Sequence, residues 1–402
     1  MGAAGGLIRA NSQTTINMGK FDFIDATFEA RRQANQVRRL RDMTPLDGAY
    51  MQVDGRRLLN CCSNDYLGLS RHPLLAERAG VFAQRYGAGA TASRLVCGNY
   101  PCFSELEARL AWLKQTSAAL ILNAGYQANA TLLPALCDRA ALILSDELNH
   151  NSIINGCRLA RCTVKRYAHN DPQDLERLLA ENADQGFSRI VIVTETVFSM
   201  DGDIVDLDAL VSLAETYNAI LMVDEAHATG VFGEKGMGLS CGKAVDVVMG
   251  TFGKGGGGFG AYVACSGRIL EYLVNYCQGF IYSTGLPPAV VGEIDAALEL
   301  IPEMEDRRRM VLENAAWFRE RMAGLGLDTG PSASQIVPVV VGDENDALDL
   351  SRYLEEKGFL VVAIRPPSVP PKKSRVRVSL SALHTRADVE RLADAFEQWR
   401  AA

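Results

Sequence analysis

The chain has 402 residues, of which 48% are hydrophobic and 22% are charged, and its formal net charge at pH 7 is -7. This composition is ordinary for a globular protein of one or two domains, and no basic stripe indicates a nucleic-acid partner. No apolar run approaches the ~18 residues that a membrane span needs, so we expect no membrane partner.

The N-terminal stretch carries no targeting signal. Residues 1–20 lack the apolar segment of a signal peptide, and we expect them to form a flexible leader. The ten cysteines include no C-x-x-C pair of the kind that binds zinc or exchanges disulfides. The sequence therefore favours a cytoplasmic protein with reduced thiols and no bound metal.

An arginine-rich stretch, "RRQANQVRRLR" at residues 31–41, follows the leader. A dense run of charge is most often the solvated face of a helix. We therefore expect this stretch, which includes Arg38 and Arg39, to lie on a helix.

Short apolar runs recur through the middle of the chain, at residues 118–123, 141–146, 189–195, 219–225, 246–252 and 260–266. Because these runs are apolar throughout, they should be strands that are buried on both faces. Amphipathic stretches lie between them, and two of these begin at Asp171 and Asp206, which can cap a helix. The alternation predicts a mostly parallel sheet with helices on both faces.

The pattern changes at about residue 285. Residues 285–327 predict two helices, or one helix broken near Pro302. The apolar runs "IVPVVVG", "FLVVAI" and "RVRVSL" follow, interleaved with helices expected at 345–358 and 385–400. This part of the chain indicates a smaller α/β unit.

A single lysine, Lys254, lies within the glycine-rich stretch "TFGKGGGGFGAY". A phosphate-binding P-loop would need a glycine in place of Val248, and Ser or Thr in place of Gly255. Gly253, Gly255 and Gly258 match the spacing of a dinucleotide fingerprint, but that fingerprint requires a helix next, and the following residues favour a strand. The sequence therefore does not favour nucleotide binding.

A covalent role suits Lys254 better. A lysine that forms a Schiff base and moves protons needs a partly desolvated site that favours the neutral amine. Neighbouring glycines let the backbone turn tightly and leave room for a ring.

Other chemistry-bearing residues follow strands at matching places. Asp224 ends a predicted strand and is followed by His227, and Ser199 lies at the end of another strand. A carboxylate at the carboxyl end of a parallel strand points into the crevice where α/β proteins bind ligands. Beneath a pyridine ring, it would keep the ring nitrogen protonated.

Two further segments complete this set. Gly125 and Tyr126 lie at a strand-to-helix turn, where backbone N–H groups can hold a phosphate. His150 could stack on the other face of a ring. Each of these residues alone has an ordinary structural explanation, but their order along the chain favours a site for a phosphorylated pyridine cofactor.

In these segments the sequence resembles the α-oxoamine synthases, which are pyridoxal 5'-phosphate (PLP) enzymes of fold type I. The resemblance runs from about Phe21 to the end of the chain and includes "CSNDYLGLS", "LNHNSIINGCRL", "TETVFSMDGD", "VDEAHATGVFGEKGMG", "TFGKG", "YSTGLPP" and "RVRVSLSALHT". It implies a large PLP-binding domain at 60–300 and a small domain at 301–402, with which residues 21–59 pack. It also implies a homodimer with a shared active site.

The resemblance implies roles for individual residues. Lys254 would form the Schiff base and move protons, Asp224 would pair with the pyridinium nitrogen, and His150 would stack on the ring. His227 and Ser199 would contact the phenolic oxygen of the cofactor. The phosphate would be held by Gly125, Tyr126 and Thr251, with Ser283 or Thr284 reaching across from a partner subunit.

The resemblance also implies a grip on an amino-acid substrate. Asn64 and Arg377 would bind its carboxylate, since the planar fork of arginine engages both oxygens. Arg375, two residues earlier, keeps its ordinary interpretation as part of an exposed, alternating strand.

Within the family, "YAHND", "HATG", "AIRPPSVP" and "IVPVVVGD" are most similar to members that condense L-alanine with a pimeloyl thioester in biotin biosynthesis. The thioester would be carried by coenzyme A or by an acyl carrier protein, and Arg38 is our candidate for its far carboxylate. A glycine-using member remains an alternative. Non-catalytic partner subunits would be expected to lack the lysine that this chain has.

The chain departs from the family at two places. Phe103 stands where the family usually has a histidine, and four glycines at 255–258 follow the lysine where relatives usually carry a larger residue. Phe103 could reflect simple repacking, and the glycines could reshape the acyl entrance. Together they could instead favour an esterified or longer acyl chain. Both departures bear on the acyl substrate more than on the chemistry.

Overall fold

The computed structural model describes residues 19–401, and residues 1–18 of the expected leader lie outside the described part. The chain divides into two units, Met1–Arg41 and Asp42–Ala402, which are described separately. In the first unit, helix α1 (Asp22–Gln33) ends where Asn35 adopts a left-handed φ of 50°. The N–H groups of Asn35 and Gln36 then bond to carbonyls of the last turn, as in a Schellman motif.

This helix end corrects one expectation. Because α1 ends at Gln33, most of the arginine-rich stretch, including Arg38 and Arg39, lies in irregular chain rather than on a helix. The left-handed turn at Asn35 is compatible with asparagine, which tolerates this conformation better than most residues.

The second unit begins with strands that the sequence analysis did not predict: β1 (Met43–Pro45), β2 (Tyr50–Val53) and β3 (Arg56–Asn60). The turn between β2 and β3 is Asp54-Gly55, with φ of 48° and 80°, a pair typical of a tight hairpin. Strand β3 also pairs in parallel with β12 (Phe359–Leu360), so this segment shares a sheet with the C-terminal part of the chain.

The central sheet has seven strands in the order β4-β10-β9-β8-β7-β5-β6. Strand β10 is antiparallel to both of its neighbours, and the other pairs are parallel. The strands are β4 (Ala118–Leu122), β5 (Leu142–Asp146), β6 (Thr163–Tyr167), β7 (Ile190–Glu195), β8 (Ile220–Asp224), β9 (Val247–Thr251) and β10 (Ala261–Cys265). All six apolar runs predicted as strands are confirmed. Strand β6 was missed because it lies at the edge of the sheet and most of its residues are exposed or half-buried.

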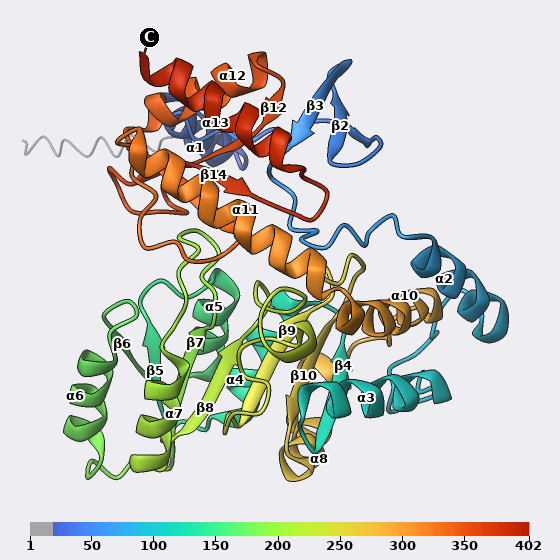
Figure 1. The fold of residues 1–402 in the computed structure, drawn as a ribbon. Helices are drawn as coiled ribbons and strands as arrows, with labels where there is room; N and C mark the ends of the chain where they lie inside the picture. Colours follow the sequence, from blue (N-terminus) through green and yellow to red (C-terminus); the bar gives the residue numbers. More distant parts are fainter. Residues whose placement is uncertain (1–18, 402) are drawn as a thin grey trace, which may run out of the picture. The chain divides into compact units, whose positions relative to one another are not determined.

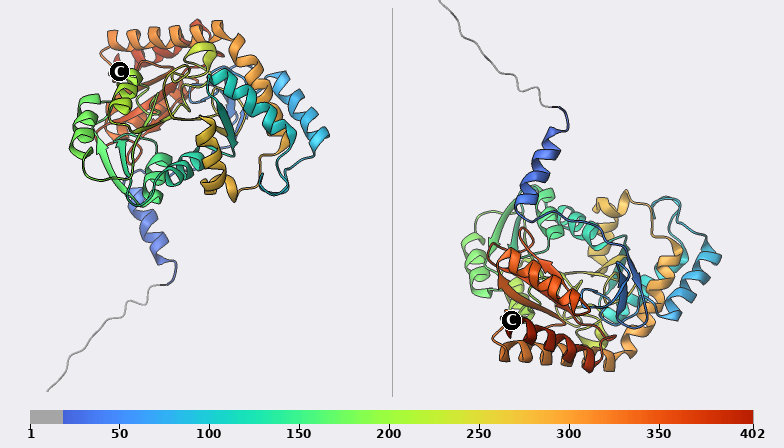
Figure 2. Two further views of the ribbon diagram at one scale, coloured as in Figure 1. Left: turned by 90° about the horizontal axis from the view of Figure 1, so that it is seen from below. Right: turned by 90° about the horizontal axis from the view of Figure 1, so that it is seen from above.

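Helices cover both faces of this sheet (Figures 1 and 2). Alternate strand residues belong to two separate apolar clusters, one on each face. One cluster packs against α2 (Pro73–Tyr86), α3 (Pro101–Lys114), α6 (Pro172–Asn182), α7 (Leu207–Thr216) and α10 (Pro288–Leu300). The other packs against α4 (Gly125–Leu136), α5 (Asn151–Ala160), α8 (Gly267–Tyr276) and α9 (Gln278–Ile281).

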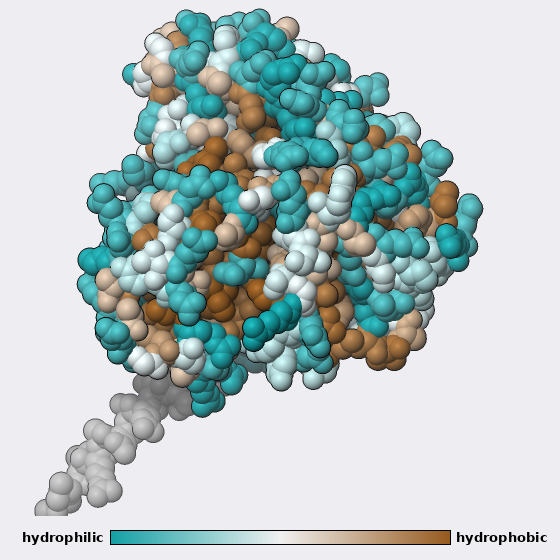
Figure 3. Space-filling view, turned by 60° about the horizontal axis from the view of Figure 1, so that its bottom comes forward, coloured by the Kyte–Doolittle hydropathy of each residue, from teal (hydrophilic) through white to brown (hydrophobic). Residues whose placement is uncertain are grey.

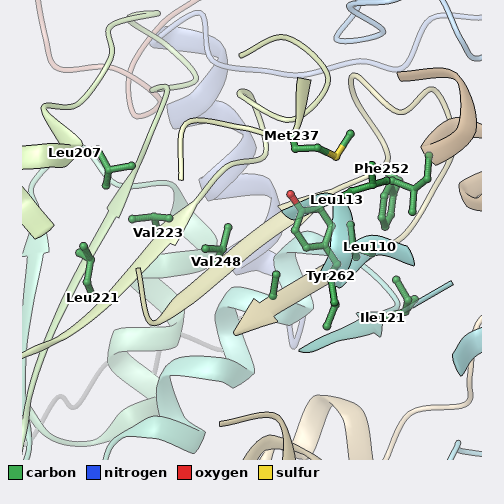
Figure 4. Packing of buried hydrophobic residues seen from close by; sticks show 14 of the residues in the cluster. Leu110, Leu113, Ile121, Leu207, Leu221, Val223, Met237, Val248, Phe252 and Tyr262 are labelled. Atoms are coloured by element: carbon green, nitrogen blue, oxygen red, sulfur yellow. The ribbon is translucent and has the colours of Figure 1, made fainter. Parts of the chain in front are cut away.

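Figure 4 shows part of the first cluster, with Leu221 and Val223 of β8 near Val248 of β9, and Tyr262 of β10 between them and α3. This packing fixes the strands whose ends carry the site. The predicted caps are also confirmed: the side chains of Asp171 and Asp206 accept N–H groups at the starts of α6 and α7.

The C-terminal part forms a smaller α/β layer next to the central sheet (Figure 1). Its elements are α11 (Glu305–Gly324), β11 (Ile336–Gly342), α12 (Glu344–Glu356), β13 (Val362–Ile364), β14 (Ser374–Ser379) and α13 (Arg386–Ala401), with β14 between β11 and β13. The expected break near Pro302 is confirmed, since a short 3-10 turn, η2 (Ile301–Glu303), separates α10 from α11. The "FLVVAI" run divides between two sheets as β12 and β13.

The interpretation of Arg375 as an exposed strand residue is wrong. Strand β14 is buried along its whole length because it lies in the middle of its sheet, and Arg375 is only 3% exposed. Its guanidinium pairs with Asp201 at 2.5 Å. The polar face of β14 thus meets the central sheet, and the opposite face, with Val376 and Val378, joins a C-terminal apolar cluster.

The surface view in Figure 3 shows hydrophilic residues over much of one face, with apolar residues gathered toward its middle. Among the described residues, no helix is both long and apolar enough to cross a membrane.

Candidate active site

Lys254 lies in the loop between β9 and β10, where the carboxyl ends of β7, β8 and β9 meet. Its Nζ is 2.9 Å from Nε2 of His227, and Nδ1 of His227 is 2.6 Å from the hydroxyl of Tyr66. Burial lowers the pKa of Lys254 to about 8, against the opposing pull of the carboxylates of Asp224 and Glu195. A substantial fraction of this amine is therefore neutral near physiological pH.

His227 connects Lys254 to the rest of the site as a neutral imidazole. Burial holds the pKa of His227 well below its usual value, and the positive charges of Lys254 and Arg377 add to this effect. The backbone carbonyl of His227 accepts a hydrogen bond from Nε2 of Gln335 at 2.8 Å, which anchors this segment to the C-terminal part of the chain.

Three of the four glycines after Lys254 have a packing role, and a methyl group at Gly256 would lie 2.9 Å from the backbone oxygen of Phe252. A methyl group at Gly255 would lie 2.3 Å from the backbone oxygen of Thr229. Gly257 has a φ of 66°, and a methyl group there would lie 2.5 Å from Leu69 Cβ and from Ser70 N. The loop can therefore carry Lys254 close to its neighbours only because side chains are absent at these positions.

Two carboxyl groups lie side by side beneath this loop. Asp224 is the last residue of β8, and Glu195, the last residue of β7, is its register partner. Asp224 accepts hydrogen bonds from Asn129 Nδ2 at 2.7 Å and from the backbone N of Ala226 at 2.8 Å. Burial, followed by the negative charge of Asp224, raises the pKa of Glu195 well above its usual value.

His150 stands beside this pair at the start of α5. Its backbone N donates to Oε1 of Glu195 at 2.7 Å, and its Nδ1 lies 2.7 Å from Ser152 Oγ. Burial lowers the pKa of His150 although the charge of Asp224 opposes the shift. The ring of Tyr126 meets the His150 ring edge-on, with the centroids 6.5 Å apart.

The N-terminus of α4 forms another wall of the site. The helix begins at Gly125 and has no side-chain cap, so its first N–H groups are available to a ligand. A methyl group at Gly125 would lie 3.7 Å from Cβ of Thr251, which places the end of β9 against this helix start. The predicted phosphate residues Gly125, Tyr126 and Thr251 therefore lie together.

The segment after α9 lies beside the same helix start. Ser283 Oγ accepts a hydrogen bond from Gln127 Nε2 at 2.5 Å, and Asn123 Nδ2 donates to the backbone oxygen of Thr284 at 2.8 Å. Within one chain, Ser283 and Thr284 thus lie close to the residues on either side of Gly125.

Arg377 is held at the boundary between the two sheets. Its Nε donates to the backbone oxygen of Ser199 at 2.6 Å, and both terminal nitrogens lie 3.3 Å from Oδ1 of Asn64. Asn64 also accepts a hydrogen bond from Tyr66, the partner of His227. Ser199 lies four residues past the end of β7, in a turn rather than at the strand end that we expected.

Two further positions were singled out from the sequence, Phe103 and Arg38. Phe103 is fully buried on α3, and the guanidinium of Arg94 lies 4.3 Å from its ring centroid. Arg38 belongs to the unit Met1–Arg41, so its position relative to the site is not described.

Tyr66, Asn129 and Glu195 were not predicted as site residues from the sequence. The signals for these residues were weak: Asn129 follows Gly125 by one helical turn, and Tyr66 follows Asn64 by two residues. Glu195 could be identified only from the pairing of β7 with β8. In the described part of the chain, no cluster of three or more His, Cys, Asp or Glu could hold a metal ion.

The fold and the site agree with comparisons to known proteins. Residues 56–396 match the profile of the aminotransferase class I and II family, and the chain belongs to this family. It is 68% identical to the "Putative 8-amino-7-oxononanoate synthase" of Desulfosudis oleivorans over 95% of this chain and 100% of that protein. It is 47% identical to the 8-amino-7-oxononanoate synthase of Geobacter sulfurreducens, over 90% of this chain and 93% of that protein.

Solved structures agree with this assignment. A lysine-to-alanine variant of serine palmitoyltransferase from S. paucimobilis, with a bound PLP–myriocin aldimine, matches with a TM-score of 0.87. Its identity is 26%, and the match covers 94% of this chain and 97% of that one. The resemblance to the α-oxoamine synthases and the predicted type I fold are thus confirmed.

Proposed function

We propose that this chain is a PLP enzyme that condenses L-alanine with a pimeloyl thioester, with loss of CO₂, to give 8-amino-7-oxononanoate. The names of relatives that are 68% and 47% identical over most of the chain support this reaction. The observation that carries the chemistry is the 2.9 Å contact between the amine of Lys254 and neutral His227, with Asp224 and Arg377 close enough to shift the pKa of Lys254.

The residues present fit PLP. The lowered pKa of Lys254 favours the neutral amine that a Schiff base requires. The buried carboxylate of Asp224 is held in place by Asn129 and can stabilise a protonated ring nitrogen. The uncapped start of α4 at Gly125, together with Thr251, suits a phosphate group. Bound there, PLP would supply an electron sink for a carbanion formed at the substrate α-carbon.

The side chains would divide the remaining work. Lys254 Nζ would remove the α-proton and later return a proton, since its lowered pKa suits transfer in both directions. His227 would remain neutral. Its contact with Tyr66 would fix the orientation of its ring, and the ring would in turn orient the amine of Lys254. His150 would close the opposite face of the ring and exclude water.

Arg377 would bind the substrate carboxylate. Four hydrogen bonds engage its guanidinium, to Ser199, Ser379 and twice to Asn64. The two bonds to Asn64 are long, at 3.3 Å, and a carboxylate would compete with them for the fork.

We further propose a homodimer with a shared site. Beside Ser283 and Thr284 the surface is unusually apolar: Tyr282 is 81% exposed and Val96 is 77% exposed. The segment that contains Val96 and the segment that contains Tyr282 are joined by an isolated β-bridge between Ser93 and Thr284. Large apolar groups that are this exposed are typical of an interface, and a second copy could bury them while its Ser283 or Thr284 reached the phosphate.

The function is tested with the purified protein and PLP. We expect a visible absorption band from bound PLP that L-alanine changes. With pimeloyl-coenzyme A or a pimeloyl carrier protein, mass spectrometry should detect 8-amino-7-oxononanoate. A product formed only with glycine would favour the alternative, a glycine-using family member. Complete absence of bound PLP would contradict the proposal.

A further inference from the structure

His169 is held between two buried carboxylates outside the residues assigned above. Its Nδ1 lies 3.0 Å from Oδ1 of Asp146, the last residue of β5, and its Nε2 lies 3.0 Å from Oδ2 of Asp203. Asp203 lies in the turn that follows β7. The ring of Phe198, from the same turn, meets the His169 ring edge-on with the centroids 4.5 Å apart. His169 therefore joins the carboxyl ends of three neighbouring strands.

The turn at 198–203 is built to hold a fixed shape. The backbone N of Phe198 donates to the oxygen of Asp203 at 3.1 Å, and the N of Gly202 donates to the oxygen of Phe198 at 2.9 Å. Gly202 has a φ of 70°, and a methyl group there would lie 2.0 Å from the backbone oxygen of Ile336. The turn thus packs directly against β11 of the C-terminal sheet.

This turn presents two acceptors to the arginines of β14. The backbone oxygen of Ser199 accepts the Nε of Arg377 at 2.6 Å, and Asp201 pairs with Arg375 at 2.5 Å. The direction of the Arg377 fork therefore depends on where the turn lies.

We propose that His169 is a positioning residue: by holding Asp203 against Asp146, it fixes the 198–203 turn and, through Ser199, aims Arg377 at the substrate carboxylate. This inference rests on the proposed function, because it takes Arg377 as the group that binds that carboxylate.

The charges around His169 favour its cationic form. Asp146 faces it from β5 and Asp203 from the turn, Glu147 accepts the backbone N of His169 at 3.2 Å, and Asp174 of α6 accepts that of Ala168 at 2.8 Å. Burial alone would lower the pKa of His169, but its hydrogen bond to Asp146 and its ionic contact with Asp203 outweigh this and raise it to about 10. The cation is therefore present at neutral pH and is lost as the pH rises through about 10.

The experiment compares three variants of the PLP-loaded enzyme. His169→Gln keeps a polar side chain but removes the cation. It should raise KM for L-alanine by about tenfold or more and change kcat by less than about threefold. The reason is that a misaligned Arg377 weakens binding of the substrate carboxylate equally in the ground state and in the transition state. The band of bound PLP should remain, since no cofactor residue has changed. Asp174→Asn, which removes a neighbouring carboxylate but leaves the His169–Asp203 pair, should keep KM within about twofold.

Asp203→Asn supplies a second measurement if His169→Gln does not fold. Removing one carboxylate should lower the pKa of His169, so the alkaline increase in KM for L-alanine should move to lower pH by about one unit. Asp174→Asn should leave that profile unchanged. Equal losses in kcat and kcat/KM for His169→Gln, or an unshifted profile for Asp203→Asn, would overturn the inference. If the wild-type enzyme shows no response to L-alanine, the proposed function itself fails instead.

Discussion

The amine of Lys254 lies 2.9 Å from Nε2 of His227, and the opposite nitrogen of that ring lies 2.6 Å from the hydroxyl of Tyr66. This chain of three groups crosses from the glycine-rich loop, through the segment after β8, to the segment after β3. A neutral imidazole in its middle lets the amine lose or gain a proton without creating a second buried charge.

Lys254→Ala should abolish turnover and leave the fold intact. Lys254 lies in a loop and does not belong to either apolar cluster of the central sheet, so the free energy of unfolding should change by less than about 1 kcal/mol. Product formation and thermal unfolding would be measured on the same preparation. Near-normal activity in this variant would contradict the assignment of Lys254.

The lowered pKa of Lys254 predicts how the PLP-free protein reacts with PLP. Because only the neutral amine attacks the aldehyde, the rate of incorporation should rise with pH and reach half its maximum near pH 8, the pKa of Lys254. Asp224→Asn removes a charge that raises this pKa, so its midpoint should move lower. A midpoint near 10.5, the ordinary value for lysine, would show that the site does not perturb this amine.

A buried ion pair supports the floor of the site. Lys114 of α3 contacts Glu225, the residue after Asp224, and both side chains are fully buried. Lys114 also donates to the backbone oxygen of Met237. Lys114→Met should leave the buried carboxylate of Glu225 without its counter-charge and destabilise the protein by ~3–5 kcal/mol. Urea unfolding would measure this, and the double change with Glu225→Leu should recover much of the loss.

Much of this architecture could be predicted from the sequence because the buried strands are apolar on both faces. Asp224 lies at a strand end and Gly125 at a helix start as expected, since apolar runs stop where those elements stop. The half-exposed hairpin of β2 and β3 gave no such signal, although its Asp54-Gly55 turn could have revealed it.

Two of the errors have a common physical cause, which is that partners distant in sequence decide the burial and the charge of a residue. Arg375 was expected to be exposed, but β14 is enclosed by β11 and β13, and Asp201 neutralises its charge. Glu195 could not be distinguished from an ordinary strand-end residue until β7 and β8 were paired. The error at Arg38 has a local cause, because the helix ends at Gln33, just before the left-handed turn at Asn35.

The shared-site dimer predicts complementation between inactive chains. Lys254→Ala chains keep Ser283 and Thr284, and chains with both of these changed to alanine keep Lys254. When the two are co-expressed, half of the dimers should be hybrids with one complete site, which gives about a quarter of wild-type activity. Each parent alone is the control. A fully active monomer at assay concentration would refute the shared site.

The last prediction concerns substrate choice. Alanine and glycine differ by one methyl group, so the site can favour alanine only by shape, which is worth about 1–3 kcal/mol, or roughly 10–200-fold. We expect L-alanine with a pimeloyl thioester to exceed glycine with an acetyl or succinyl thioester by at least about tenfold. Arg377→Lys should weaken both amino acids about equally, because it loses the bidentate fork that grips a carboxylate common to both. Competition assays with each amino acid and with pimeloyl, acetyl and long-chain thioesters would measure this. A clear preference for glycine would exclude 8-amino-7-oxononanoate synthesis and leave only the family assignment.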